Sequence, residues 1–131
     1  MQNNNNQNGN QNNFEPVIAI KTYAIYLKFA PLLNRFPKLY RYSLGQKIED
    51  TMLELLEYIF KANSLPRPLR EMPLVDANAK FELLKLLMRA TAELGILVNT
   101  QYFQLSADLA EVGRMLGGWL IYVRGGPNNK E

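Results

Sequence analysis

Apolar residues recur at intervals of three and four along most of the chain, and no segment alternates with a period of two. This spacing places apolar side chains on one side of an α-helix. It predicts helices over residues 16–34, 43–63, 76–99 and 106–123. Helices of about 20 residues are about 30 Å long, and short connections between them favour antiparallel packing. The pattern therefore predicts an all-α fold, an antiparallel up-down four-helix bundle.

Several residues are expected to mark the ends of these helices. Ser43 with Gln46 three residues later is typical of a capping box at the start of the second helix. Asp76 and Ser106 are expected to cap the third and fourth helices in the same way. Pro31 is expected to kink or loosen the first helix. Residues 64–73 contain three prolines and predict a stiff, non-helical connection.

The third helix offers two neighbouring apolar rows that could face the core. One row consists of Phe81, Leu84 and Met88, and the other consists of Leu83, Leu87, Ala90, Leu94 and Leu97. Both rows follow helical spacing, and the second helix also carries two such rows. This is wider than one bundle core needs and predicts an oligomer.

The two ends of the chain differ in composition from the middle. Of the first 13 residues, 11 are Asn or Gln, which predicts a disordered tail because such a tract buries little apolar area. The predicted organisation is a tail over residues 1–13, a bundle over 14–124 and a flexible C-terminal tail over 125–131. The first tail lacks the basic and apolar regions of a signal peptide, and no long apolar run follows it. We therefore expect a cytoplasmic protein with no membrane segment.

The residue types present argue against an enzyme. The chain has neither Cys nor His, which excludes disulfides, thiolate and histidine metal ligands, and a Ser-His-Asp triad. The acids of the second helix alternate with its apolar stripe, which is typical of a solvated face. The spacing of Gly113 and Gly117 lacks the Gly-Lys-Ser/Thr ending of a phosphate-binding loop. We expect no catalytic residue, no metal and no cofactor.

The net charge is only +3, but the charges are unevenly distributed. Residues 16–48 contain six basic residues and no acid, a distribution that attracts polyanions. Lys21, Lys28 and Arg35 recur every seven residues and are expected to line one stripe. Lys85 and Arg89 form a second basic pair, four residues apart. The alternative is that these side chains only solvate one side of the bundle.

Residues 35–42 interleave cations with aromatic and apolar side chains. This composition can bind phosphates and stack on unpaired bases, which makes Arg35, Lys38 and Arg41 candidate nucleic-acid contacts facing solvent. The alternative is that the aromatic residues close the end of the bundle while the cations extend into solvent.

Three glycines lie inside the fourth predicted helix, at positions 113, 117 and 118. Each costs about 1 kcal/mol relative to alanine in a helix interior. Gly113 and Gly117 share a helical face, which predicts the close approach of another backbone. That backbone belongs either to the same bundle or to a neighbouring subunit. Gly113, Gly117, Gly118 and Trp119 are therefore candidate packing or subunit-interface residues.

Two sequence motifs, in this order, resemble those of a known family. The first is Arg-Phe-Pro-Lys…Arg-Tyr-Ser-Leu-Gly over residues 35–45, and the second is Glu-Val-Gly-Arg-Met-Leu-Gly-Gly-Trp over residues 111–119. This family is the accessory variability determinant (Avd) family of diversity-generating retroelements. It belongs to a four-helix superfamily with the proteins encoded in 23S rRNA intervening sequences. The resemblance covers roughly residues 18–122. Arg35, Lys38, Arg41 and residues 113–119 match the family motifs, whereas Lys21, Lys28, Lys85 and Arg89 come from the charge pattern alone.

The resemblance implies a non-catalytic protein that forms a ring-shaped homo-pentamer with a basic surface. Such a protein binds the element's reverse transcriptase, its template RNA and the derived cDNA, and supports mutagenic retrohoming. The alternative is a structural or protein-interaction bundle that binds no nucleic acid, like other members of the superfamily.

Overall fold

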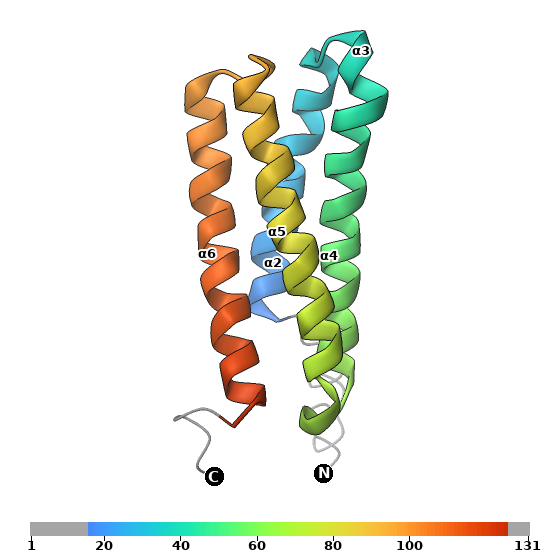
Figure 1. Ribbon diagram of the computed structural model, residues 1–131, viewed down its shortest axis with the longest axis vertical. Helices are drawn as coiled ribbons and strands as arrows, with labels where there is room; N and C mark the ends of the chain where they lie inside the picture. Colours follow the sequence, from blue (N-terminus) through green and yellow to red (C-terminus); the bar gives the residue numbers. More distant parts are fainter. Residues whose placement is uncertain (1–15, 126–131) are drawn as a thin grey trace, which may run out of the picture.

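The computed structural model describes residues 16–125, which form an antiparallel bundle of four long helices. These are α2 (Val17–Phe29), α4 (Gln46–Ser64), α5 (Glu71–Glu93) and α6 (Asn99–Val123). In Figure 1, α2 and α5 run in one direction and α4 and α6 run in the other. Each helix packs on two neighbours, with α2 contacting α4 and α6 and α5 contacting the same two. The predicted all-α four-helix bundle is confirmed. The predicted tail over residues 1–13, and the predicted tail over 125–131 apart from Gly125, lie outside the described residues.

The core contains the apolar stripe that the sequence pattern predicts for each helix. In α4, residues Ile48, Met52, Leu55 and Ile59 are fully buried. In α5 the row of Phe81, Leu84 and Met88 is buried in the core. In the other row Leu87 is half-buried against the core, Leu97 beyond the helix is buried, and Leu94 at the end of the helix is exposed.

The predicted helix starts are wrong at three points. The Ser43 hydroxyl donates to the carbonyl of Leu39 (3.1 Å) within a helical run that begins at Lys38, so Ser43 caps no helix. Helix α5 starts at Glu71, five residues before Asp76, because Pro73 fits the first turn of a helix, where no intrahelical N–H bond is lost. Helix α6 starts at Asn99, which leaves Ser106 in its interior.

The proline-containing segments form short 3₁₀ turns. After Phe29 the chain tightens into the 3₁₀ turn η2 (Ala30–Arg35), with Pro31 in its first turn, so the α-helix ends at the proline by tightening and not by the expected kink or loosening. The connection between α4 and α5 contains η4 (Arg67–Leu69) and is therefore partly helical, which corrects the prediction for residues 64–73.

A tight junction joins α2 to α4 at the upper end of the bundle in Figure 1. It consists of η2, the single turn α3 (Lys38–Tyr40) and the π-helical turn η3 (Arg41–Gly45) that leads into α4. Gly45 is buried: a Cβ atom there would lie 2.7 Å from Leu33 Cδ2 and 3.1 Å from Phe36 Cδ2. The Phe36 ring is also buried and meets Phe29 edge-on, with ring centroids 5.8 Å apart. The junction is thus packed onto bare glycine backbone.

Two arginines fix the opposite end of the bundle. Arg67 donates to the carbonyl of Tyr122 near the end of α6 (2.9 Å) and lies over the Tyr122 ring, 4.3 Å from its centroid. Arg70 donates to the carbonyl of Leu65, just after α4 (2.7 Å), and lies 5.9 Å from the centroid of Trp119. Cations at helix C-termini satisfy free carbonyls and oppose the negative end of the helix dipole. These contacts hold the α4–α5 connection against α6.

The three glycines of α6 have different surroundings. A Cβ atom on Gly113 would clash with the buried ring of Phe81 on α5, with Cε2 2.8 Å away. A Cβ atom on Gly117 or Gly118 would meet nothing within 4 Å. The predicted close approach therefore occurs inside the bundle at Gly113, but the approaching group is the Phe81 side chain and not a backbone. No such approach occurs at Gly117 within this chain.

This difference predicts opposite effects for two single-methyl substitutions. Gly113→Ala should lower the free energy of unfolding by about 1–2 kcal/mol, because overpacking against Phe81 exceeds the gain in helix propensity. Gly117→Ala should leave it unchanged or raise it by up to about 1 kcal/mol. Urea unfolding followed by circular dichroism measures both. Equal changes in the two variants would contradict the packing described at Gly113.

Candidate nucleic-acid interface

The structure does not bring Lys21, Lys28 and Arg35 onto one free basic stripe. Lys21 Nζ lies 2.6 Å from Glu111 Oε1 and Lys28 Nζ lies 2.8 Å from Asp108 Oδ2, so both lysines pair with acids of α6. The hydrogen bond from Lys21 and its positive charge hold the pKa of the Glu111 carboxyl below its ordinary value. Arg35 lies beyond these pairs in η2, where the 3₁₀ turn breaks the seven-residue register. The two lysines join α2 to α6.

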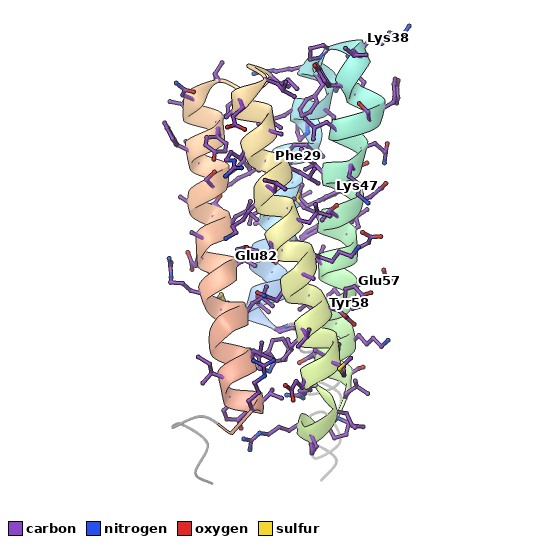
Figure 2. All side chains as sticks on the ribbon, viewed as in Figure 1. Phe29, Lys38, Lys47, Glu57, Tyr58 and Glu82 are labelled. Carbon is purple, nitrogen blue, oxygen red and sulfur yellow. The ribbon has the colours of Figure 1, made fainter. Side chains whose placement is uncertain are left out.

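Lys85 and Arg89 are also paired with acids. Lys85 Nζ lies 3.2 Å from Glu82, and Arg89 Nε lies 3.8 Å from Glu93. These neighbours on α5 balance the two like charges that the sequence places four residues apart. Figure 2 shows Glu82 midway along α5, well away from Lys38. This pair is therefore a separate and locally neutralised group.

The cations of the upper junction form a different group. Arg35, Lys38 and Lys47 are exposed, and none of them makes an ion pair within residues 16–125. In Figure 2, Lys38 lies at the upper end of the bundle and Lys47 lies below it on α4. Lys47 was not singled out from the sequence, although it belongs to the acid-free segment 16–48. These three side chains are available to an external anion.

Arg41 has a structural role that the sequence did not reveal. It is half-buried, and its Nη2 donates to the carbonyls of Asn34 (3.1 Å) and Phe36 (3.2 Å). These carbonyls lie at the end of η2, where the helix supplies no further N–H groups. The expectation that Arg41 faces solvent is therefore wrong, and this side chain holds the junction in its shape.

The aromatic and apolar residues of the junction separate into two groups. Phe36 is buried and Tyr40 is half-buried against the core, as expected for residues that close the end of a bundle. Leu39 and Tyr42 remain 76% and 72% exposed. The two interpretations of segment 35–42 thus apply to different residues, and only Leu39 and Tyr42 are free to contact a ligand.

Two further surfaces carry exposed side chains without an explanation inside the protomer. One lies on α2 and α4, where five large apolar residues are about half-exposed: Ile20, Tyr23, Leu27, Leu53 and Phe60. The other is the outer side of α6, with Gly117 and Gly118 in open space next to Trp119. Trp119 itself is half-buried and packs on the core, and with Met115, Pro16, Val17 and Ile18 it lines an apolar hollow between α2 and α6.

Chemistry-bearing groups are sparse elsewhere in the described chain. Residues 16–125 contain no cluster of side chains suited to a metal ion. None of the helices described here is both long and apolar enough to cross a bilayer. Tyr26 donates to Glu49 Oε2 (3.3 Å), and the negative charge of Glu49, with desolvation, raises the pKa of the Tyr26 phenol. This pair joins α2 to α4 in the same way as the lysine pairs join α2 to α6.

Comparison with known proteins gives one finding. A family model described as bAvd-like matches residues 16–123, which span all four long helices and both ends of the bundle. No curated protein and no solved structure matches the chain.

Proposed function

Because the chain belongs to the bAvd-like family, we propose that it is the non-catalytic accessory protein of a diversity-generating retroelement. In this role it binds the element's reverse transcriptase, the template RNA and the cDNA in the cytoplasm, and it supports mutagenic retrohoming. The observation that carries the nucleic-acid part is the group of exposed cations at the upper junction, Arg35, Lys38 and Lys47, which have no acidic partner in the described chain.

The junction suits a phosphate backbone better than the paired cations of α2 and α5 do. Four of the other candidate cations would have to break an ion pair before they bind a phosphate: Lys21, Lys28, Lys85 and Arg89. Arg35 and Lys38 give up only water, and each phosphate they neutralise releases counterions. Contacts of this kind position a nucleic acid with little sequence preference. We therefore assign the main electrostatic contact to the junction.

A homo-pentameric ring belongs to the same proposal. A ring needs two different surfaces on each protomer, one of which binds the other on the next copy. The exposed apolar residues of α2 and α4 and the open glycine surface of α6 provide two such surfaces. In a ring the junction cations would be repeated around one rim, which multiplies the small charge of each protomer. The same surfaces would serve the alternative function, a protein-interaction bundle that binds no nucleic acid.

Removing the free cations should weaken RNA binding, whereas removing the paired ones should not. Arg35→Gln with Lys38→Gln should lower RNA affinity and reduce the salt dependence, with the slope of log K against log salt falling by about 1.5 for two phosphate contacts. Lys85→Gln with Arg89→Gln removes the same charge and serves as the matched control. Fluorescence anisotropy with labelled RNA measures both, and circular dichroism should show full helicity in each.

A larger loss of affinity in the Lys85/Arg89 variant would move the contact to α5. Absence of RNA binding by the unmodified protein at low salt would favour the interaction bundle without nucleic acid.

The ring predicts a specific effect for a large residue at position 117. Gly117→Leu adds a side chain that meets nothing in its own protomer, so the fold should keep its helicity. The substitution should reduce the oligomer size, because the leucine side chain would clash with a neighbouring copy that packs on α6 at Gly117 and Gly118. Light scattering at micromolar concentration distinguishes a 15.1 kDa monomer from a five-copy assembly.

A monomeric unmodified protein in that measurement would overturn the ring. An oligomer of unchanged size in the Gly117→Leu variant would place the subunit interface elsewhere.

A further inference from the structure

Leu39 and Tyr42 are the most exposed apolar and aromatic side chains of the upper junction, at 76% and 72%. We propose that they form a stacking platform for unpaired bases, so that the nucleic acid held at this junction is single-stranded. This inference rests on the proposed function. It adds that the bound nucleic acid is single-stranded and names the residues that favour a single strand over a duplex.

The two residues are close in the chain. Leu39 lies in the single turn α3, and Tyr42, three residues later, lies in the π-helical turn η3 that follows it. The Ser43 hydroxyl, which donates to the Leu39 carbonyl, ties the same turn together (3.1 Å). The exposed Tyr42 ring offers a face on which a base can stack, and Leu39 adds exposed apolar area in the preceding turn.

The platform stands on a rigid support. Arg41, next to Tyr42, is fixed by its hydrogen bonds to the carbonyls of Asn34 and Phe36. Below it, Phe36 and Leu33 pack directly onto the backbone of Gly45. Because the backbone of this turn is already fixed, it needs no ordering when a ligand binds, so more of the stacking energy contributes to affinity.

The charges around the platform match a nucleic-acid strand. Arg35 and Lys38 precede Tyr42 in the sequence, Lys47 follows it, and residues 16–48 contain no acid. These cations can hold phosphates of a strand whose base rests on Tyr42. In a duplex the bases are already stacked and paired, and the platform would find no free base face. A duplex can therefore contact only the cations through its phosphates, whereas a single strand can contact the cations and also stack a base on the Tyr42 ring.

The expected gain from the platform is measurable. Stacking of one base on an aromatic side chain corresponds to about a 5- to 150-fold change in Kd. Because stacking releases no counterions, the loss of the ring should lower affinity for single strands without changing the salt dependence. Loss of a cation should change both.

The test compares three ligands for the full chain: a short single-stranded RNA, a duplex of the same sequence, and inorganic polyphosphate. Tyr42→Ala should weaken binding of the single strand about tenfold or more and leave the duplex and polyphosphate affinities unchanged. Tyr42→Phe should retain the affinity for the single strand, because the ring and not the hydroxyl is used. Phe103→Ala is the matched control, since Phe103 is a comparably exposed aromatic residue (63%) on α6.

Several results would overturn the platform. Unchanged single-strand affinity in Tyr42→Ala would do so, as would an equal loss for all three ligands. Loss of reverse-transcriptase binding with unchanged RNA affinity would identify Leu39 and Tyr42 as a protein-docking surface instead. In each of these cases RNA binding by the unmodified protein leaves the proposed function standing. If the unmodified protein binds none of the three ligands, both the platform and the nucleic-acid role fail.

Discussion

The packing of Phe36 and Leu33 onto the bare backbone of Gly45 is the contact on which the upper end of the bundle depends. Only a residue without a Cβ atom lets the 3₁₀ turn lie this close to the start of α4. Once the turn is seated, its terminal carbonyls point toward Arg41, which satisfies them. The free cations and the exposed Tyr42 therefore occupy defined positions because they are attached to a packed corner and not to a loose loop.

Ion pairing determines which basic residues remain available. The chain uses Lys21 and Lys28 to join α2 to α6, and it balances Lys85 and Arg89 with acids on their own helix. At the lower end, Arg67 and Arg70 are occupied by the carbonyls of Tyr122 and Leu65. The net charge of +3 therefore says little about binding. Much of the charge that remains unpaired lies at the junction between α2 and α4.

The sequence predicts the four helices and most of the core because apolar spacing reflects local helical geometry. It fails where a contact depends on residues far apart in the chain. The capping signals at Ser43, Asp76 and Ser106 were misleading because each lies inside a helix that starts earlier. The stripe of cations was also misleading, because Glu111 and Asp108 reach Lys21 and Lys28 only in the folded bundle. The role of Gly113 required knowing that Phe81 packs against it.

Hydrogen–deuterium exchange shows whether nucleic acid contacts this protein at the α2–α4 junction. Exchange of the full chain would be measured with and without single-stranded RNA at low salt. RNA bound at the junction should slow the exchange of backbone amides over residues 35–47 and leave α5 unchanged near Lys85 and Arg89. Protection centred on residues 82–93, with no change over 35–47, would contradict it.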